Sequence, residues 1–240
     1  MSFLRAEWRK LAIANYAIDK ECLTEFLPAG TELDLWNGKC FASLIGFMFK
    51  NTRLLGIKIP WHVNFEEVNL RFYVKRFENG EWKRGVVFIK EIVPKRALTF
   101  VANTFYNERY ETLPMSHKWS EDEQARTVVY SWTKAGKENV FQVTSSIESF
   151  EIGLGSETEF ITEHYWGYTK INDFKTTEYE VTHPKWRAYE VKEFEINVDF
   201  GSVYGRGFEF LNTQEPTSVM LAEGSEITVE NKKTIKTIRP

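Results

Sequence analysis

Residues 67–92 read EVNLRFYVKRFENGEWKRGVVFIKEI, and this stretch decides the fold. Its first arm has an apolar residue at every even position from Val68 to Val74, which predicts a strand with one apolar face. Asn79-Gly80 then supplies the two positive-φ positions of a tight turn, and the chain returns through residues 84–90. The stretch therefore predicts a long antiparallel hairpin.

A two-residue loop would determine which side chains share a face of this hairpin. The apolar face would hold the pairs Phe72–Val87 and Leu70–Ile89, and the other face Asn69–Lys90, Arg71–Phe88 and Tyr73–Val86. A face that mixes cations, an amide, a phenol and an aromatic ring is typical of a pocket wall. The same register opposes Lys75 to Arg84 and Glu78 to Glu81, so a longer loop is the alternative.

Composition limits the class of protein. The 240 residues suit one domain spanning 1–240, and 42% hydrophobic with 15% aromatic residues excludes a disordered chain. A net charge of −3 gives no overall basic field, which argues against a nucleic-acid partner. Two cysteines make no disulfide framework, and neither a signal peptide nor an apolar run of about 20 residues is visible. We therefore expect a soluble, cytoplasmic domain without a membrane partner, and we leave a homo-oligomer open.

Strand and turn signals recur along the rest of the chain. Asn37-Gly38 predicts a second hairpin between residues 32–36 and 39–44, and residues 134–137 predict a third. Further strands are predicted at residues 11–18, 165–170, 175–181, 188–196 and 208–211.

Three short helices accompany these strands. The first covers residues 20–27 behind the N-cap Asp19, and the second covers residues 95–107, where apolar residues recur at helical spacing. The capping box from Ser156 to Glu159 begins the third, which ends near residue 163. Antiparallel strands with short turns and a few helices predict one mainly β (α+β) domain.

Several segments together resemble a YqjF-like family of uncharacterised conserved proteins. The matching segments are 7–11 (EWRKL), 27–34 (LPAGTELD), 67–74 (EVNLRFYV), 84–88 (RGVVF), 160–165 (FITEHY) and 183–186 (HPKW). The resemblance implies the acetoacetate decarboxylase-like fold, a closed antiparallel β-barrel or cone around a cavity. It implies no particular reaction, because none is assigned to this branch.

The distant decarboxylase relatives use a lysine Schiff base just beyond a helix equivalent to residues 97–107, and an arginine on the first strand. The resemblance places Arg9 at the position of that arginine. The lysines would fall near Arg109-Tyr110, but no lysine occurs between residues 96 and 118. An arginine stays protonated and cannot serve as the amine nucleophile. We therefore expect the cavity, but not the decarboxylase mechanism, to carry over.

The candidate ligand-binding residues are polar groups that the barrel would direct inward. An arginine inside a barrel binds a carboxylate or phosphate through two parallel hydrogen bonds, and tyrosines cover an apolar ligand body. The alternative is an internal salt bridge of Arg71 with Glu67 or Glu108. The predicted set is Arg9, Asn69, Arg71, Lys90, Tyr106, Arg109 and Tyr110.

Lys90 has two interpretations. Beside Arg71 in a desolvated pocket, its amine would lose affinity for its proton, as a substitute Schiff-base lysine requires. Alternatively, Lys90 ends a strand in water next to Glu91.

Other chemistry-bearing motifs are missing from the sequence. The four histidines show no H-x-x-x-H or H-E-x-x-H spacing, so we predict no metal. No G-x-S-x-G elbow of a serine hydrolase occurs, and the glycines at 201–207 lack the P-loop lysine, so we expect no nucleotide cofactor.

Three hypotheses for function follow. The first is a barrel that binds a small, anionic and partly apolar metabolite. The second is an enzyme on the decarboxylase-like scaffold that uses acid–base groups such as Glu67, Glu91 or Tyr110. The third is an interaction domain whose barrel is filled solid with side chains.

Overall fold

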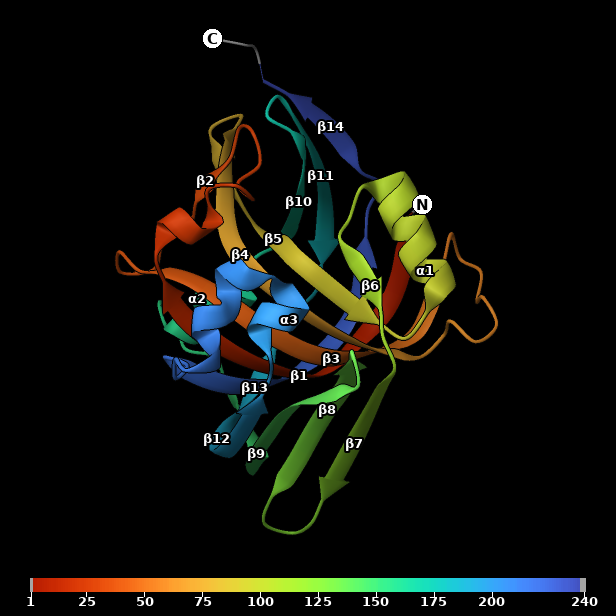
Figure 1. Ribbon diagram of the computed structural model, residues 1–240, viewed down its shortest axis with the longest axis vertical. Coiled ribbons are helices and arrows are strands. Elements are labelled where there is room, and N and C mark those ends of the chain that lie inside the picture. Colours follow the sequence, from red (N-terminus) through yellow and green to blue (C-terminus); the bar gives the residue numbers. More distant parts are fainter. Residues whose placement is uncertain (1, 238–240) are drawn as a thin grey trace.

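The computed structural model describes residues 2–237, except for the side chains of Phe105 and Tyr106. Strands dominate it, and the few helices are short (Figure 1). The strands are β1 (Leu4–Ile18), β2 (Glu32–Leu33), β3 (Cys40–Leu54), β4 (Phe65–Glu78), β5 (Glu81–Val93), β6 (Tyr110–Thr112), β7 (Met115–Glu121), β8 (Arg126–Lys134), β9 (Lys137–Glu151), β10 (Trp166–Asn172), β11 (Lys175–Thr182), β12 (Arg187–Asn197), β13 (Ser218–Val229) and β14 (Lys233–Lys236). The helices are η1 (Lys20–Leu23), α1 (Arg96–Val101), η2 (Ala102–Tyr106), α2 (Glu157–Thr162), α3 (Phe200–Tyr204) and η3 (Arg206–Asn212).

The central strands close into a ring. Hydrogen bonds connect β11, β10, β5, β4, β3, β1 and β13 in that order, and β13 pairs again with β11 through Val181–Val229. Most of these pairings are antiparallel, whereas β5 lies parallel to β10 and to β6. This ring is the barrel or cone that the family resemblance implies.

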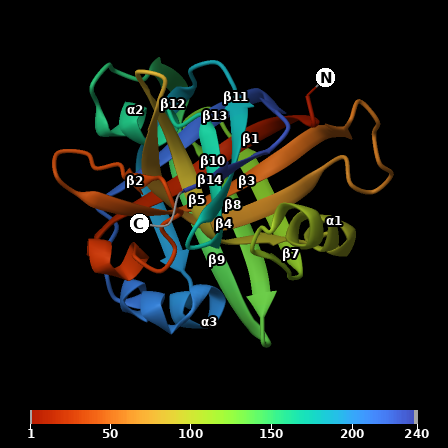
Figure 2. The same ribbon diagram turned by 90° about the horizontal axis from the view of Figure 1, so that it is seen from above.

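A second group of strands extends the sheet outside the ring. Strands β12, β9, β8 and β7 continue from β13 and lie below the ring in Figure 1. Their apolar residues, such as Tyr130, Trp132 and Phe141, form one core with Leu70 and Phe72 of β4. Figure 2 shows α3 at the lower left of the ring and α1 at its right.

Alternation along β4 separates this outer core from the inside of the ring. Because successive side chains point to opposite faces, Leu70 and Phe72 join the outer core. Tyr73 belongs to a second core with residues such as Phe47, Val86 and Trp186. Residues of this second core line a cavity, so the interior is not filled solid, contrary to the third hypothesis.

The hairpin of β4 and β5 has the predicted two-residue loop but contains one bulge. Arg71–Phe88, Phe72–Val87 and Tyr73–Val86 pair as expected. A register shift between Leu70 and Arg71 then pairs Leu70 with Lys90 and Asn69 with Glu91, so the predicted pairs Leu70–Ile89 and Asn69–Lys90 are wrong. A bulge turns the side chains beyond it to the opposite face. It therefore places Glu91, instead of Lys90, inside the ring.

Three other predictions need correction. The second predicted hairpin does not form. Glu32–Leu33 pairs with β4 instead, and across the Asn37-Gly38 turn Trp36 and Lys39 form an isolated bridge. The predicted strand at 208–211 lies in the 3-10 helix η3, where Phe208 and Leu211 are buried at helical spacing. The predicted helix at 20–27 is shorter, ending at Leu23.

The N-cap of the predicted capping box at α2 is confirmed, but its reciprocal bond reaches the amide before Ser156. The Ser156 hydroxyl accepts a hydrogen bond from the Glu159 amide at 3.1 Å, and the Glu159 carboxylate accepts one from the Gly155 amide. We expect Ser156→Ala to lower the free energy of unfolding by about 1 kcal/mol, because that helical amide loses its acceptor. Urea denaturation measures this, with the exposed Ser120→Ala as control. Equal stability of both variants would contradict it.

Candidate functional site

A cavity of about 270 Å³ lies inside the ring. One of its walls is aromatic, formed by Trp8 of β1, by Phe47 and Phe49 of β3, and by Phe65 and Trp186. Trp8 packs edge to face against Phe47, Phe49 and Trp186 with ring centroids 5.4–6.3 Å apart. These contacts hold the aromatic wall in a fixed shape suited to an apolar ligand body.

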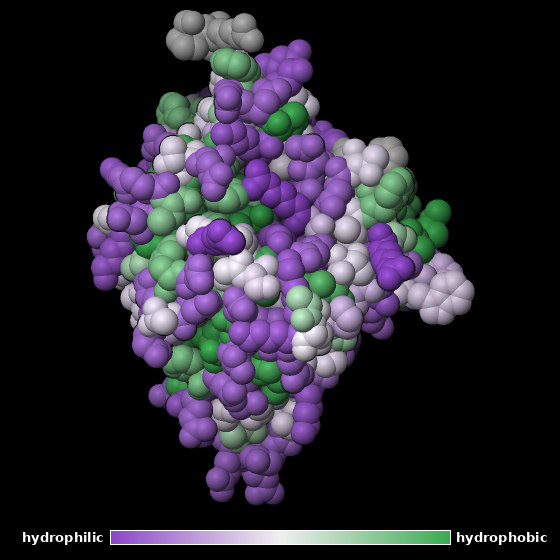
Figure 3. All heavy atoms as spheres, in the orientation of Figure 1, coloured by the Kyte–Doolittle hydropathy of each residue, from purple (hydrophilic) through white to green (hydrophobic). Residues whose placement is uncertain are grey.

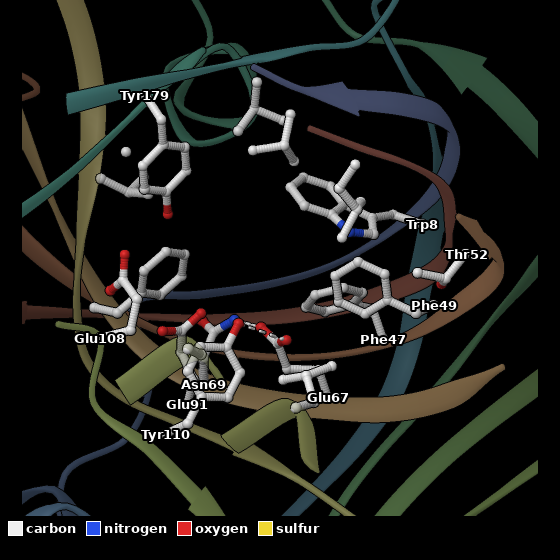
Figure 4. Close-up of a pocket in the computed structure, with 18 of the residues that line it drawn as sticks. Trp8, Phe47, Phe49, Thr52, Glu67, Asn69, Glu91, Glu108, Tyr110 and Tyr179 are labelled. Atoms are coloured by element: carbon white, nitrogen blue, oxygen red, sulfur yellow. Dashed lines mark hydrogen bonds between the residues drawn. The ribbon is translucent and has the colours of Figure 1, made fainter. Parts of the chain in front are cut away.

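The opposite wall is polar and acidic. Figure 4 shows Glu67, Asn69, Glu91, Glu108, Tyr110 and Tyr179 grouped on one side of the cavity, with Trp8, Phe47 and Phe49 on the other. Alternation on β4 brings Glu67 and Asn69 inward, the bulge brings Glu91 beside Asn69, and parallel pairing sets Tyr110 next to Glu91. Four separate segments therefore build one polar wall.

Two hydrogen bonds hold Glu67 in place. The Asn69 amide nitrogen donates to Glu67 Oε1 at 3.0 Å, and the Tyr110 hydroxyl donates to Glu67 Oε2 at 3.4 Å. Glu108 in turn accepts from the Thr169 hydroxyl at 2.8 Å. Glu108 and Tyr110 are half-buried and line the cavity.

Burial changes the acidity of these carboxyl groups. Loss of solvation raises the pKa of Glu67 from 4.5 to about 7, although the hydrogen bonds from Asn69 and Tyr110 oppose the change. Burial, reinforced by the charges of Glu67 and Glu108, raises the pKa of Glu91 well above its ordinary value, and burial raises the pKa of Glu108 as well. The wall therefore offers protonated carboxyl groups near neutral pH, which donate hydrogen bonds as well as accept them.

Several polar atoms that line the cavity have no hydrogen-bond partner among the residues that the structure describes. They are Trp8 Nε1, Thr52 Oγ1, Asn69 Oδ1, Arg71 Nε, Glu91 Oε2 and His164 Nδ1. A buried polar atom without a partner costs about 1–3 kcal/mol, so this number of them makes the cavity the candidate binding site of the fold.

Arg71 lines the same cavity and is 8% exposed. Its NH2 nitrogen donates to the Ile161 carbonyl at 3.4 Å, and its guanidinium lies 5.6 Å from the Tyr73 ring centroid. Among the described residues, no carboxylate oxygen lies within 4 Å of it, so the alternative of a built-in salt bridge with Glu67 or Glu108 is not realised. A buried guanidinium without an anion is costly, and a bound anion removes that cost.

His164 also lines the cavity, and Asp34 fixes the position of its ring. Its Nε2 lies 3.1 Å from Asp34 Oδ2, and Arg84 Nε donates to the same oxygen at 2.6 Å. Burial lowers the pKa of His164 to about 4, although the hydrogen bond that His164 makes to the Asp34 carboxylate opposes the change. The ring is therefore neutral near pH 7 and, when Nε2 carries the proton, leaves Nδ1 as an acceptor at the cavity.

The structure brings together only part of the predicted ligand-binding set. Asn69, Arg71 and Tyr110 line the cavity. Arg9 instead pairs with Glu7 at 2.7 Å, and Arg109 is exposed, with its guanidinium 4.9 Å from the Phe26 ring centroid. The Tyr106 side chain lies outside the described part of the structure.

Lys90 lies on the outer side of the ring. Its amine pairs with Glu111 at 2.9 Å and donates to the Val203 carbonyl, and burial lowers its pKa. The bulge explains this position, because it reverses the face that Lys90 occupies. Lysine is absent from the described residues that line the cavity.

Reductive trapping should therefore leave the protein unmodified. Incubation with pyruvate or acetoacetate followed by borohydride is expected to leave the intact mass unchanged, because no lysine is among the described residues that line the cavity. Mass spectrometry of the whole chain makes the measurement, and a covalent adduct located on Lys90 would reverse the conclusion.

Sequence reasoning missed several cavity residues, namely Trp8, Tyr179, His164 and the aromatic side chains of β3. The alternation that placed Asn69 and Arg71 inward was also present in β3, where Phe47 and Phe49 follow one another on one face. Within residues 2–237 no three His, Cys, Asp or Glu side chains are arranged so that they could hold a metal ion, and no helix is long and apolar enough to span a bilayer.

Comparison with known proteins gives a sequence family and a fold. Residues 5–226 match the family described as "Uncharacterized conserved protein" (DUF2071). The uncharacterised protein YqjF of Bacillus subtilis is 28% identical over 200 residues, covering 82% of this chain and 78% of YqjF.

Solved structures with the same fold share little sequence with the chain. Acetoacetate decarboxylase from Legionella pneumophila has a TM-score of 0.67 at 13% identity, covering 97% of this chain and 86% of that one. An acetoacetate decarboxylase-like enzyme from Sphingomonas wittichii has a TM-score of 0.66 at 10% identity, with coverage of 99% and 95%. The enduracididine biosynthesis enzyme MppR, complexed with pyruvate, has a TM-score of 0.65 at 11% identity, with coverage of 98% and 91%. At these identities the likeness concerns the fold alone.

Proposed function

The chain belongs to the DUF2071 family of uncharacterised conserved proteins, and from that premise we propose that its cavity binds a small, partly apolar metabolite with one anionic end. The observation that carries the proposal is Arg71, a buried cation at the cavity without a carboxylate partner among the described residues. A ligand carboxylate supplies the missing partner through charge-assisted hydrogen bonds.

The two walls of the cavity fit such a ligand. Trp8, Phe47 and Phe49 contact its apolar body, while protonated Glu67 and Glu91 donate hydrogen bonds to its head group (Figure 4). Because these carboxyl groups are neutral when protonated, they do not repel an anion. One structural neighbour, MppR, is complexed with pyruvate, itself a small carboxylate.

Three probes of one shape and different charge test the proposal. Phenylacetate, 2-phenylethanol and 2-phenylethylamine share an aromatic body and differ in the head group. The three probes are compared at one concentration, a hundredfold above the Kd of phenylacetate. At pH 6 we expect phenylacetate to raise the melting temperature most, by about 5–10 °C, and the amine least. The reverse order would assign the carboxyl groups as counter-ions of a cationic ligand and overturn the proposal.

A second candidate function is acid–base catalysis on the bound molecule. It is favoured by Glu67, whose pKa of about 7 suits proton transfer at neutral pH, and by the hydrogen bond that Tyr110 donates to it. The matching reaction is removal of a proton from carbon beside a carbonyl. Incubation with pyruvate in deuterium oxide tests it: enzyme-dependent loss of the methyl proton signal supports catalysis, and an unchanged rate leaves binding alone.

The remaining aspects of function rest on composition. Net charge −3 favours a small-molecule partner over nucleic acid. Cys22 and Cys40 are both unpaired, which fits a reducing compartment such as the cytoplasm.

A further inference from the structure

Exposed apolar side chains gather around one edge of the cavity. They come from the β3–β4 loop and from α1, which lie on the same side of the molecule in Figures 1 and 2. Their exposed fractions are Leu55 54%, Ile57 68%, Ile59 41%, Trp61 86%, Phe100 65% and Val101 38%. Ile59 and Val101 also line the cavity, so the cavity reaches the surface here. We call these six residues, together with Lys58, Lys95 and Arg96, the mouth surface.

The backbone of the β3–β4 loop holds these side chains outward. Leu55, Gly56 and Trp61 adopt positive φ angles of 49°, 83° and 60°, and Leu54 and Ile57 form an isolated bridge across the tip. A left-handed conformation is unfavourable for a bulky side chain. Since Trp61 is 86% exposed, packing within the chain does little to offset the cost of this conformation. Strain without intramolecular burial indicates a surface shaped for an external contact.

The charge of the same two segments is one-sided. Residues 53–64 and 94–107 contain Arg53, Lys58, Lys95 and Arg96 and no aspartate or glutamate, whereas the whole chain carries a net charge of −3. None of these four cations makes an ion pair with a residue that the structure describes. Figure 3 shows apolar groups projecting at the edge of the molecule occupied by α1.

We infer that the mouth surface docks peripherally on an anionic lipid bilayer. Surfaces that bind at a membrane interface combine Trp and Phe with Lys and Arg. Their apolar side chains enter the head-group region, and their cations contact anionic lipids. Two copies of the chain joined through this surface would bring cations against cations, which disfavours a symmetric dimer. This inference departs from the expectation of no membrane partner, which rested only on the lack of a spanning segment in the sequence.

Docking in this way sets the cavity mouth against the lipid. A partly apolar ligand then passes between bilayer and aromatic wall without crossing bulk water, a consequence that rests on the proposed function. The docking itself does not depend on any ligand.

Vesicle sedimentation of the full chain tests the inference. We expect binding to vesicles of phosphatidylcholine with 30% phosphatidylserine at low salt, weakened by added salt, and little binding to pure phosphatidylcholine. Trp61→Ser with Phe100→Ser should weaken it at least tenfold. Reversal of Lys58 or Arg96 to glutamate should weaken it about fivefold or more each, since fivefold corresponds to about 1 kcal/mol per cation.

Matched variants elsewhere are the controls. Leu154→Ser changes a residue that is 84% exposed and does not line the cavity, and Lys118→Glu reverses an exposed lysine on β7. Both should bind vesicles like the wild type, and circular dichroism checks that every variant is folded. Absence of binding to anionic vesicles, or equal binding by all variants, overturns the inference. Sedimentation equilibrium showing a dimer that Trp61→Ser dissociates would assign the mouth surface to a second copy instead.

Discussion

Arg71→Met is expected to weaken phenylacetate binding about a hundredfold or more while the fold persists. The guanidinium lines the cavity, and its Nε lacks a hydrogen-bond partner. Removing a charge-assisted, desolvated contact to a carboxylate costs about 2–5 kcal/mol of binding free energy. Methionine fills a similar volume without a charge, so the apo fold should lose little stability. Isothermal titration measures the affinity, and urea denaturation measures the stability.

Arg109→Met is the matched control for this experiment. Arg109 is exposed and is not among the described cavity-lining residues, so its loss should leave phenylacetate binding unchanged. A loss of about 3–5 kcal/mol of stability in Arg71→Met would instead indicate an internal acid as the native partner. Unchanged binding with unchanged stability would remove Arg71 from the site.

The central hairpin shows what a local pattern determines. Alternation and the Asn79-Gly80 turn were sufficient to predict the register from Arg71–Phe88 onward to the loop. The bulge at Ile89 of β5, opposite Leu70 and Arg71, was not predictable, because no glycine or proline marks it in the sequence. That one extra residue exchanges Lys90 for Glu91 inside the ring and thereby changes the chemistry of the wall.

The rest of the site depends on contacts between distant parts of the chain. Trp8, Glu108, His164 and Tyr179 meet in one cavity only because β1, β11 and the segments before β6 and β10 surround the same space. Neither spacing nor composition specifies such a meeting. The alternating pattern was sufficient to predict the inward face of β4. The residues beside it in the cavity are determined by how the ring of strands closes.

Glu67 should make the stability of the protein depend on pH in a way that one substitution reveals. Its folded-state pKa of about 7 lies above the ordinary 4.5, so the folded state holds this proton more tightly than the unfolded state. The resulting stability is fully present below pH 4.5 and is lost as pH rises through about 7. His164, with a pKa lowered to about 4, acts in the opposite direction between pH 4 and 6.5.

Glu67→Gln isolates the contribution of Glu67 from that of His164. Glutamine keeps the acceptor for Asn69 and cannot ionise, so it avoids the cost of a buried carboxylate. We therefore expect the difference in unfolding free energy between the variant and wild type to shift in favour of the variant by about 2–3 kcal/mol from pH 5 to pH 8. Urea denaturation at the two pH values measures this difference. The exposed Glu123→Gln should show none. A variant that gains nothing at pH 8 would mean that Glu67 ionises in the fold as readily as in water, and the protonated wall proposed for ligand binding would be lost.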